Sequence, residues 1–178
     1  METSIDDPYA PARIARALGA AIGNRPVVFA CIGTDRSTGD AFGPLVGDRL
    51  RAIGADVIGT LEEPLHALNL THRLRQVGAR TPNPLVVAVD AALGPKERVG
   101  TICIHAGGIN PGRAIGKRLD SVGEVSITAT VNVATGGDRE RTLQSTRLFF
   151  VARVAQIVAT GCDYALEDRR GSQRVKAA

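Results

Sequence analysis

The chain has 178 residues, of which 44% are hydrophobic and 22% are charged, with a net charge of +4. This length corresponds to about one domain, and the composition excludes disordered and fibrous proteins. No apolar run approaches the length of about 18 residues that a membrane span requires, and the acidic segment Met1–Asp7 is unlike a signal peptide. We therefore expect a cytoplasmic protein that does not bind membranes.

Two further classes of partner or site are disfavoured by the composition. The positive charge is modest and only 3% of the residues are aromatic, so we do not expect a nucleic-acid partner. The cysteines Cys31, Cys103 and Cys162 are odd in number and far apart, which favours buried free thiols over disulfides or a zinc site.

Strand and helix patterns alternate from the N-terminus. Apolar residues at four-residue spacing predict a helix between Pro11 and Gly23, and the apolar run Val27–Ile32 predicts a buried central strand. An apolar stripe then predicts a helix from about Asp40 to Gly54, with Asp40 as its N-cap. The remaining predicted elements are a strand at Asp56–Leu61, a helix at His66–Val77, strands at Leu85–Asp90, Gly100–His105 and Val125–Val133, and a long helix from Leu143 to Val158.

The connections between these elements predict a mixed sheet in a single domain. Only a short segment joins the strands Leu85–Asp90 and Gly100–His105, so we expect them to be antiparallel. We divide the chain into an N-terminal helix packed on the core (1–25), one α/β domain (26–160) and a basic, mobile tail (161–178).

Two aspartates follow predicted strands. Asp40 comes after the first strand, in a glycine-rich segment that begins at Gly33, and Asp90 ends the third strand. In open α/β sheets, ligands bind at the carboxyl ends of the strands, so this pair is our candidate site. The alternative is structural: Asp40 as a helix N-cap and Asp90 as an acceptor for backbone N–H groups of the next turn.

A glycine-rich loop between the last two strands, residues 106–118, is the second candidate feature. Loops of this length are often functional, and this one carries Asn110, Arg113, Lys117 and Arg118. It is either a flap that binds substrate or an ordinary surface loop.

Several motifs resemble the YyaC family of sporulation proteins: Cys31–Asp40 continuing through Gly43–Gly47, Gly59–Pro64, Asn69–Thr71 and Ala88–Gly94. More remotely, Asp40–Pro44 and Val89–Leu93 are similar to the two catalytic segments of the spore germination protease. Gly108–Gly112 with Gly116–Arg118 resembles another stretch of that protease. The resemblance implies a hydrogenase-maturation-protease-like (phosphorylase/hydrolase-like) three-layer α/β/α sandwich with a mixed, mostly parallel five-stranded sheet.

The resemblance also implies a sporulation-associated peptidase with Asp40 and Asp90 as catalytic residues. Two close carboxyls cannot both ionise cheaply; we expect Asp40, at a helix start, to be the base and Asp90 the acid. Asp35 and Arg36, which the protease pattern lacks, are substrate-binding candidates together with the flap residues, and Arg36 is able to pair with either carboxylate. Small acid-soluble spore proteins are the candidate substrates, in a spore-forming cell or forespore, and a homo-oligomer is left open.

Two alternatives remain at this point. One is a non-catalytic sporulation factor that binds a peptide or protein partner. The other is a metal-dependent or metal-sensing endopeptidase of the maturation type, although the three histidines His66, His72 and His105 show no ligand spacing. We expect no cofactor, since the chain has neither a phosphate loop nor a dinucleotide fingerprint.

Overall fold

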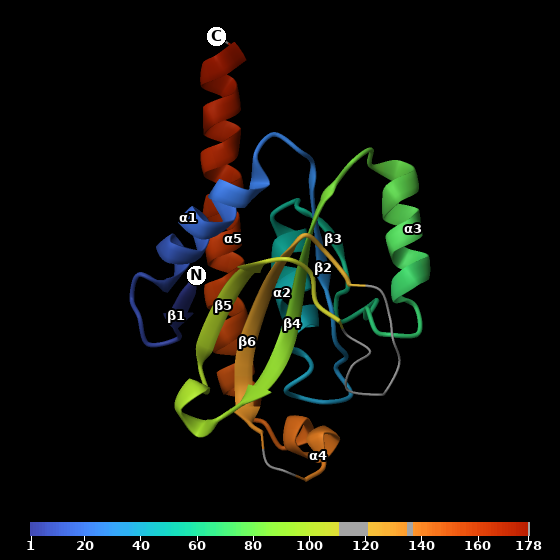
Figure 1. The fold of residues 1–178 in the computed structure, drawn as a ribbon, viewed down its shortest axis with the longest axis vertical. Coiled ribbons are helices and arrows are strands. Elements are labelled where there is room, and N and C mark those ends of the chain that lie inside the picture. Colours follow the sequence, from blue (N-terminus) through green and yellow to red (C-terminus); the bar gives the residue numbers. More distant parts are fainter. Residues whose placement is uncertain (111–120, 135–136, 178) are drawn as a thin grey trace.

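The computed structural model describes residues 1–110, 121–134 and 137–177. One sheet lies between two layers of helices (Figure 1). The helices are α1 (Ala10–Ile22), α2 (Phe42–Ala52), α3 (Leu70–Arg80), α4 (Arg139–Gln144) and α5 (Leu148–Ala177), with a 3-10 turn at Lys96–Arg98. The strands are β1 (Glu2–Ser4), β2 (Val27–Cys31), β3 (Asp56–Ile58), β4 (Leu85–Gly94), β5 (Thr101–Ala106) and β6 (Val125–Val133).

The sheet has the strand order β1-β5-β6-β4-β2-β3. Strands β3, β2, β4 and β6 are parallel, whereas β5 runs antiparallel to β6 and β1 antiparallel to β5. The predicted sandwich with a mixed, mostly parallel sheet is confirmed. Strand β5 is opposite in direction to β4, as expected, but β6 lies between them.

Alternating side chains divide the core between the two faces of the sheet. On one face, Phe29, Val87 and Ile127 pack with apolar residues of α1, α2 and α5. On the other face, Val28 and Ala88 pack with α3 residues and with the segment around Val122. This division explains why β2 and β4 are almost continuously apolar in sequence, because helices cover both of their faces.

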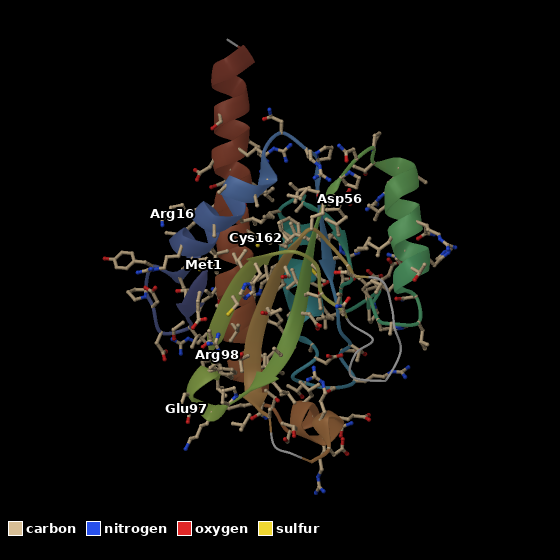
Figure 2. The ribbon with its side chains drawn as sticks, in the orientation of Figure 1. Met1, Arg16, Asp56, Glu97, Arg98 and Cys162 are labelled. Carbon is tan, nitrogen blue, oxygen red and sulfur yellow. The ribbon has the colours of Figure 1, made fainter. Side chains whose placement is uncertain are left out.

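The sheet has six strands instead of the expected five. Strand β1 is short and polar, and it forms because it pairs with the edge strand β5. The amino group of Met1 donates to the Ile104 carbonyl at 2.7 Å, and Arg98 forms an ion pair with Glu2, also at 2.7 Å (Figure 2). No local periodicity in three residues could have shown this strand.

Helix α3 and the predicted final helix also differ from the prediction. Helix α3 begins at Leu70 instead of His66, because the side chain of Asn69 accepts the His66 N–H at 2.9 Å and closes a turn before the helix. The predicted final helix is two helices. The hydroxyls of Ser145 and Thr146 both donate to the Thr142 carbonyl. These bonds end α4 before α5 begins at Leu148.

Helix α5 continues far beyond the expected domain boundary at residue 160. Cys162, Ala165 and Leu166 are buried in the same core as the sheet, so the first part of the expected tail belongs to the packed body. The segment Leu148–Ser172 is long and apolar enough to cross a membrane by length and composition. Its buried side chains pack on the sheet, as in the core helix of a soluble α/β domain.

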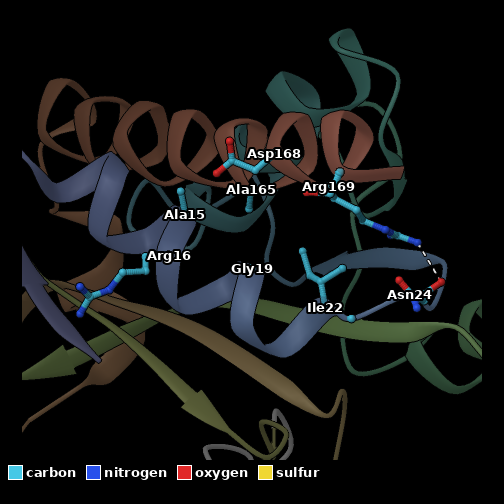
Figure 3. Close-up of a pocket in the computed structure, with 10 residues that line it drawn as sticks. Ala15, Arg16, Gly19, Ile22, Asn24, Ala165, Asp168 and Arg169 are labelled. Carbon is cyan, nitrogen blue, oxygen red and sulfur yellow. Dashed lines mark hydrogen bonds between the residues drawn. The ribbon is translucent and has the colours of Figure 1, made fainter. Parts of the chain in front are cut away.

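A hollow of about 340 Å³ lies between α1 and α5, next to the segment that precedes β2 (Figure 3). Arg169 reaches across it and donates to the Asn24 carbonyl at 3.1 Å. This hollow is at the amino end of the parallel strands, opposite the edge at which the candidate aspartates lie.

Candidate functional site

Asp40 and Asp90 lie at the carboxyl edge of the parallel strands, where the strand order reverses. The chain passes from β2 through α2 to β3 on one side, and then through α3 to β4 on the other side of β2. A crevice forms at such a switch point, because the two connections leave β2 and β4 in opposite directions. Asp40 lies in the connection that leaves β2, and Asp90 lies on β4.

Asp90 is inside a strand instead of at its end. Strand β4 pairs with β2 only as far as Val89, whereas its pairing with β6 continues through Asp90, opposite Thr128, to Gly94. The prediction that the strand stops at Asp90 is therefore wrong, because β6 supports four further residues. Asp90 is the first β4 residue beyond the stretch paired with β2, which leaves its side chain half-buried at the edge of the crevice.

Asp40 is not the N-cap of α2. The cap position is Ala41, no side chain caps the helix, and Asp40 belongs to the turn before it. The loop closes tightly on itself: Gly33 has φ +142°, and a Cβ on it would lie 2.0 Å from the Asp40 carbonyl oxygen. A glycine is required there, so that the start of the loop packs directly against the backbone of Asp40.

The two carboxyls influence each other's protonation. Burial, and then the charge of Asp40, raise the pKa of Asp90 to about 7 from an ordinary value of 3.8. Burial also raises the pKa of Asp40, while the Thr34 backbone N–H and the positive charge of Arg139 oppose that rise. The Asp90 carboxyl therefore keeps its proton up to about pH 7.

A cavity of about 590 Å³ opens beside Asp40. It lies between the loop after β2 and helix α4, and its lining residues are Thr34, Arg36, Ser37, Asp40, Asp138, Arg139, Glu140, Leu143 and Gln144. The lining carries charges of both signs around an apolar patch at Leu143. Such a cavity suits a polar but electrically neutral chain better than a strongly charged ligand.

Gly39 joins the loop to the far wall of this cavity. Its N–H donates to the Leu143 carbonyl at 2.8 Å, and a Cβ on it would lie 2.8 Å from the Leu143 side chain and 3.0 Å from the Thr146 hydroxyl. Asn132 of β6 in turn donates to the Thr142 carbonyl at 3.0 Å. The sheet, α4 and the Asp40 loop are thereby held in one arrangement.

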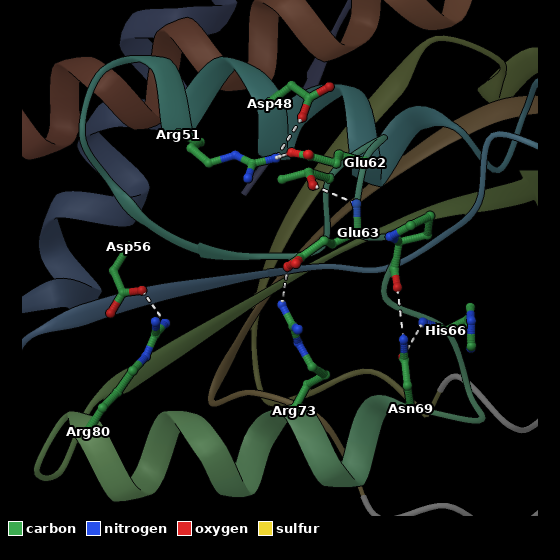
Figure 4. Close-up of polar contacts among 11 residues, drawn as sticks. Asp48, Arg51, Asp56, Glu62, Glu63, His66, Asn69, Arg73 and Arg80 are labelled. Atoms are coloured by element: carbon green, nitrogen blue, oxygen red, sulfur yellow. Dashed lines mark hydrogen bonds and ion pairs between the residues drawn. The ribbon is translucent and has the colours of Figure 1, made fainter.

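The loop before α3 supports the Asp40 loop, and its own contacts around Asn69 and His66 are shown in Figure 4. The Asn69 side chain accepts the His66 N–H and donates to the Pro64 carbonyl, both at 2.9 Å, and so fixes the residues on either side of Leu65. The Leu65 carbonyl then accepts the Gly33 N–H at 2.8 Å. This places the Asn69–Thr71 and Gly59–Pro64 motifs in a supporting role beside the site.

The other predicted site residues do not all lie beside the two aspartates. Arg36 lines the cavity, but among the described residues it forms no ion pair with Asp40 or Asp90, so the expected pairing is not seen. Asp35 and Asn110 are exposed, and no contact joins Asn110 to either aspartate within the part of the chain that is described. Arg113, Lys117 and Arg118 lie outside the described residues.

Arg139 was not among the site residues predicted from the sequence. It is exposed on α4, and its charge lowers the pKa of both Asp40 and Asp90. The Asp138 carboxylate caps α4 by accepting the N–H groups of Glu140 at 2.9 Å and Arg141 at 3.3 Å. An aspartate before a helical pattern is an N-cap signal that could have separated α4 from α5 and drawn attention to this segment.

A metal site does not emerge from the described residues. Across residues 1–110, 121–134 and 137–177, no three His, Cys, Asp or Glu side chains gather closely enough to hold a metal ion. All three cysteines are buried free thiols, as the sequence predicts.

Comparison with solved structures identifies the fold. The chain superposes on a NiFe hydrogenase maturation protease, HycI from Thermococcus kodakarensis KOD1, with a TM-score of 0.56 over 84% of this chain and 98% of that one. The sequences are 18% identical, so the similarity is one of fold. It confirms the hydrogenase-maturation-protease architecture that the motifs implied.

Comparison of sequences identifies the family. The chain is 42% identical over 140 residues to the uncharacterized protein YyaC of Bacillus subtilis (strain 168), which covers 77% of this chain and 68% of that protein. Residues 2–161 match the family model described as "Protein of unknown function (DUF1256)". The expected membership is confirmed: the chain belongs to the DUF1256 family, together with YyaC.

Proposed function

We propose that this protein is an aspartic-type endopeptidase in which Asp40 and Asp90 hydrolyse a peptide bond of a protein substrate. One observation carries the proposal: two half-buried carboxyls lie at the carboxyl edge of the sheet, and burial, followed by the charge of Asp40, raises the pKa of Asp90 to about 7. An aspartate that only caps a helix or accepts backbone N–H groups in a turn needs no second carboxyl that raises its pKa. Perturbed pairs of this kind are typical of sites that do acid–base work.

The chemistry follows from the two protonation states. Ionised Asp40 accepts a proton from a water molecule as the water oxygen attacks the peptide carbonyl carbon, and Asp90 donates its proton to the carbonyl oxygen. The resulting gem-diol collapses when Asp40 returns a proton to the amide nitrogen and the C–N bond breaks. Asp90 recovers its proton from a diol hydroxyl, so both carboxyls finish as they began.

Arg139 has a defined part in this scheme. Its charge and the Thr34 backbone N–H both favour the ionised form of Asp40, which acts as the base, while burial keeps Asp90 protonated. These two groups, instead of a helix N-terminus, would make Asp40 the base. The roles are those expected from the sequence, but the physical reason is different.

The substrate and the setting come from the family resemblance. Small acid-soluble spore proteins are the candidate substrates, in the forespore or the spore-forming cell. A chain in extended form would cross the edge of the sheet, with its scissile bond at the aspartates and one flank in the cavity beside α4. The flap residues Asn110, Arg113, Lys117 and Arg118 remain candidates for binding its other flank, and a homo-oligomer remains a proposal.

The test is a mass-spectrometric digest of small acid-soluble spore proteins by the purified protein, beside Asp40→Asn, Asp90→Asn and the control Asp168→Asn. Asp168 is exposed on α5, at the opposite edge of the sheet. We expect discrete cleavage that both site variants lose and the control keeps, with or without a chelator. The rate should fall as pH rises above about 7, because Asp90 then loses the proton that it donates.

Other outcomes point to the alternatives. Cleavage that the chelator abolishes would move the assignment to a metal-dependent endopeptidase. Spore proteins that bind equally well to the wild type and to the Asp40→Asn, Asp90→Asn double variant, without cleavage, would instead indicate a non-catalytic binding factor.

A further inference from the structure

Ser37 has a buried hydroxyl that no described part of the fold uses. Ser37 is 9% exposed, and its Oγ has no hydrogen-bond partner among the described residues. Buried polar groups in native proteins almost always find partners, and an exception calls for an explanation such as a bound ligand or a catalytic role. Ser37 also lines the cavity beside Asp40.

The backbone places Ser37 and Asp40 in one rigid turn. The Ser37 carbonyl accepts the Ala41 N–H at 3.0 Å, and Gly39, inside this turn, donates to the Leu143 carbonyl at 2.8 Å. The backbones of the two residues therefore keep a constant relation to each other and to α4. Rotation of the serine about χ1 moves its hydroxyl between staggered positions without a change in the backbone.

We propose that the Ser37 hydroxyl donates a hydrogen bond to the carbonyl oxygen of the scissile peptide. This inference rests on the proposed function and names one further group that contacts the substrate. The ligand is a neutral amide carbonyl instead of an anion, because the two arginines in the cavity lining are outnumbered by the three carboxyl groups of Asp40, Asp138 and Glu140.

The hydroxyl acts without transferring its proton. Asp90 supplies the proton that the carbonyl oxygen gains, and Ser37 stabilises the charge that develops on this oxygen before the proton arrives. A donor that is already in position contributes more to the transition state than to the bound substrate, since the oxygen becomes more negative as the reaction proceeds. Removing it should therefore lower kcat more than it raises KM.

The experiment compares Ser37→Ala, Ser37→Cys and the control Ser172→Ala, which is exposed on α5. Each variant is assayed for cleavage of spore proteins and for its urea unfolding midpoint. Loss of a donor of this kind typically lowers kcat by about 10²–10³-fold, and we expect this for Ser37→Ala with little change in KM. Ser37→Cys, with a similar shape and a weak donor, should fall between alanine and the wild type.

Stability separates this role from a structural one. Because the hydroxyl has no partner among the described residues, its removal should leave the unfolding midpoint unchanged or raise it. A lower midpoint in Ser37→Ala would show that the hydroxyl supports the fold and would overturn the inference. Wild-type turnover in Ser37→Ala would overturn it while the proposed function stands, whereas a wild type without turnover would overturn both.

Discussion

Replacing Asp90 with asparagine should stabilise the protein at neutral pH. The raised pKa means that the folded protein binds a proton more tightly than the unfolded chain does, so the folded state is penalised wherever the unfolded aspartate is ionised. Asparagine has nearly the same shape, remains neutral, and its side-chain oxygen can still accept the Ala91 N–H that Asp90 accepts at 2.8 Å. The variant removes the penalty and keeps the packing.

The magnitude follows from the pKa of Asp90. Each tenfold change in a protonation equilibrium is worth about 1.4 kcal/mol, so a rise from 3.8 to about 7 corresponds to about 4 kcal/mol. Below pH 3.8 both states are protonated and the penalty vanishes. As pH rises through the window from 3.8 to about 7, the wild type loses this stability relative to the variant, and above that window the difference is constant.

Urea unfolding of the wild type and Asp90→Asn across this pH range measures the difference directly. NMR titration of the Asp90 carboxyl carbon gives its pKa independently. In Asp40→Asn, the pKa of Asp90 should fall but stay above 3.8, because burial, the larger cause, remains. A stability difference that does not change with pH, or an Asp90 pKa near 3.8 in the wild type, would refute the coupled pair.

Three further perturbations test the elements around the pair. Arg139→Ala should raise the pKa of both aspartates, measured by the same NMR titration, and Arg139→Lys should return both pKa values most of the way to those of the wild type. Unchanged pKa values in Arg139→Ala would show that Arg139 does not act on the site. Asn69→Ala breaks two hydrogen bonds beside Leu65 and should lower the free energy of unfolding by about 1–3 kcal/mol and reduce turnover at unchanged pH dependence. Gly39→Ala should destabilise the protein by about 1–3 kcal/mol, since its Cβ would meet Leu143. Gly78→Ala, with open space around it on α3, should stabilise the protein by about 0.5–1 kcal/mol. Equal effects of the two substitutions in urea unfolding would contradict this packing.

Much of the fold could be predicted because burial on two faces leaves a strong local pattern. The run Val27–Ile32 and the segment Val125–Val133 appear as β2 and β6 with almost the predicted bounds, since the first is continuously apolar and the second is rich in β-branched residues. Strand β1 left no such signal, because only its pairing with β5 makes it a strand. The extension of β4 beyond Asp90 likewise depends on β6, which is more than thirty positions away in the sequence.

The sequence by itself determined the types of residue at the site and the strands near them, since Asp90 directly follows one recognisable apolar run and Asp40 follows another across a glycine-rich segment. Only the tertiary structure decided that Asp40 lies before the helix instead of capping it, that Arg139 and not Arg36 acts on both carboxyls, and that the Ser37 hydroxyl has no partner among the described residues. The reason is physical. Periodicity reports which face of an element is buried, whereas pKa values and unpaired hydrogen bonds depend on groups brought together from distant parts of the chain.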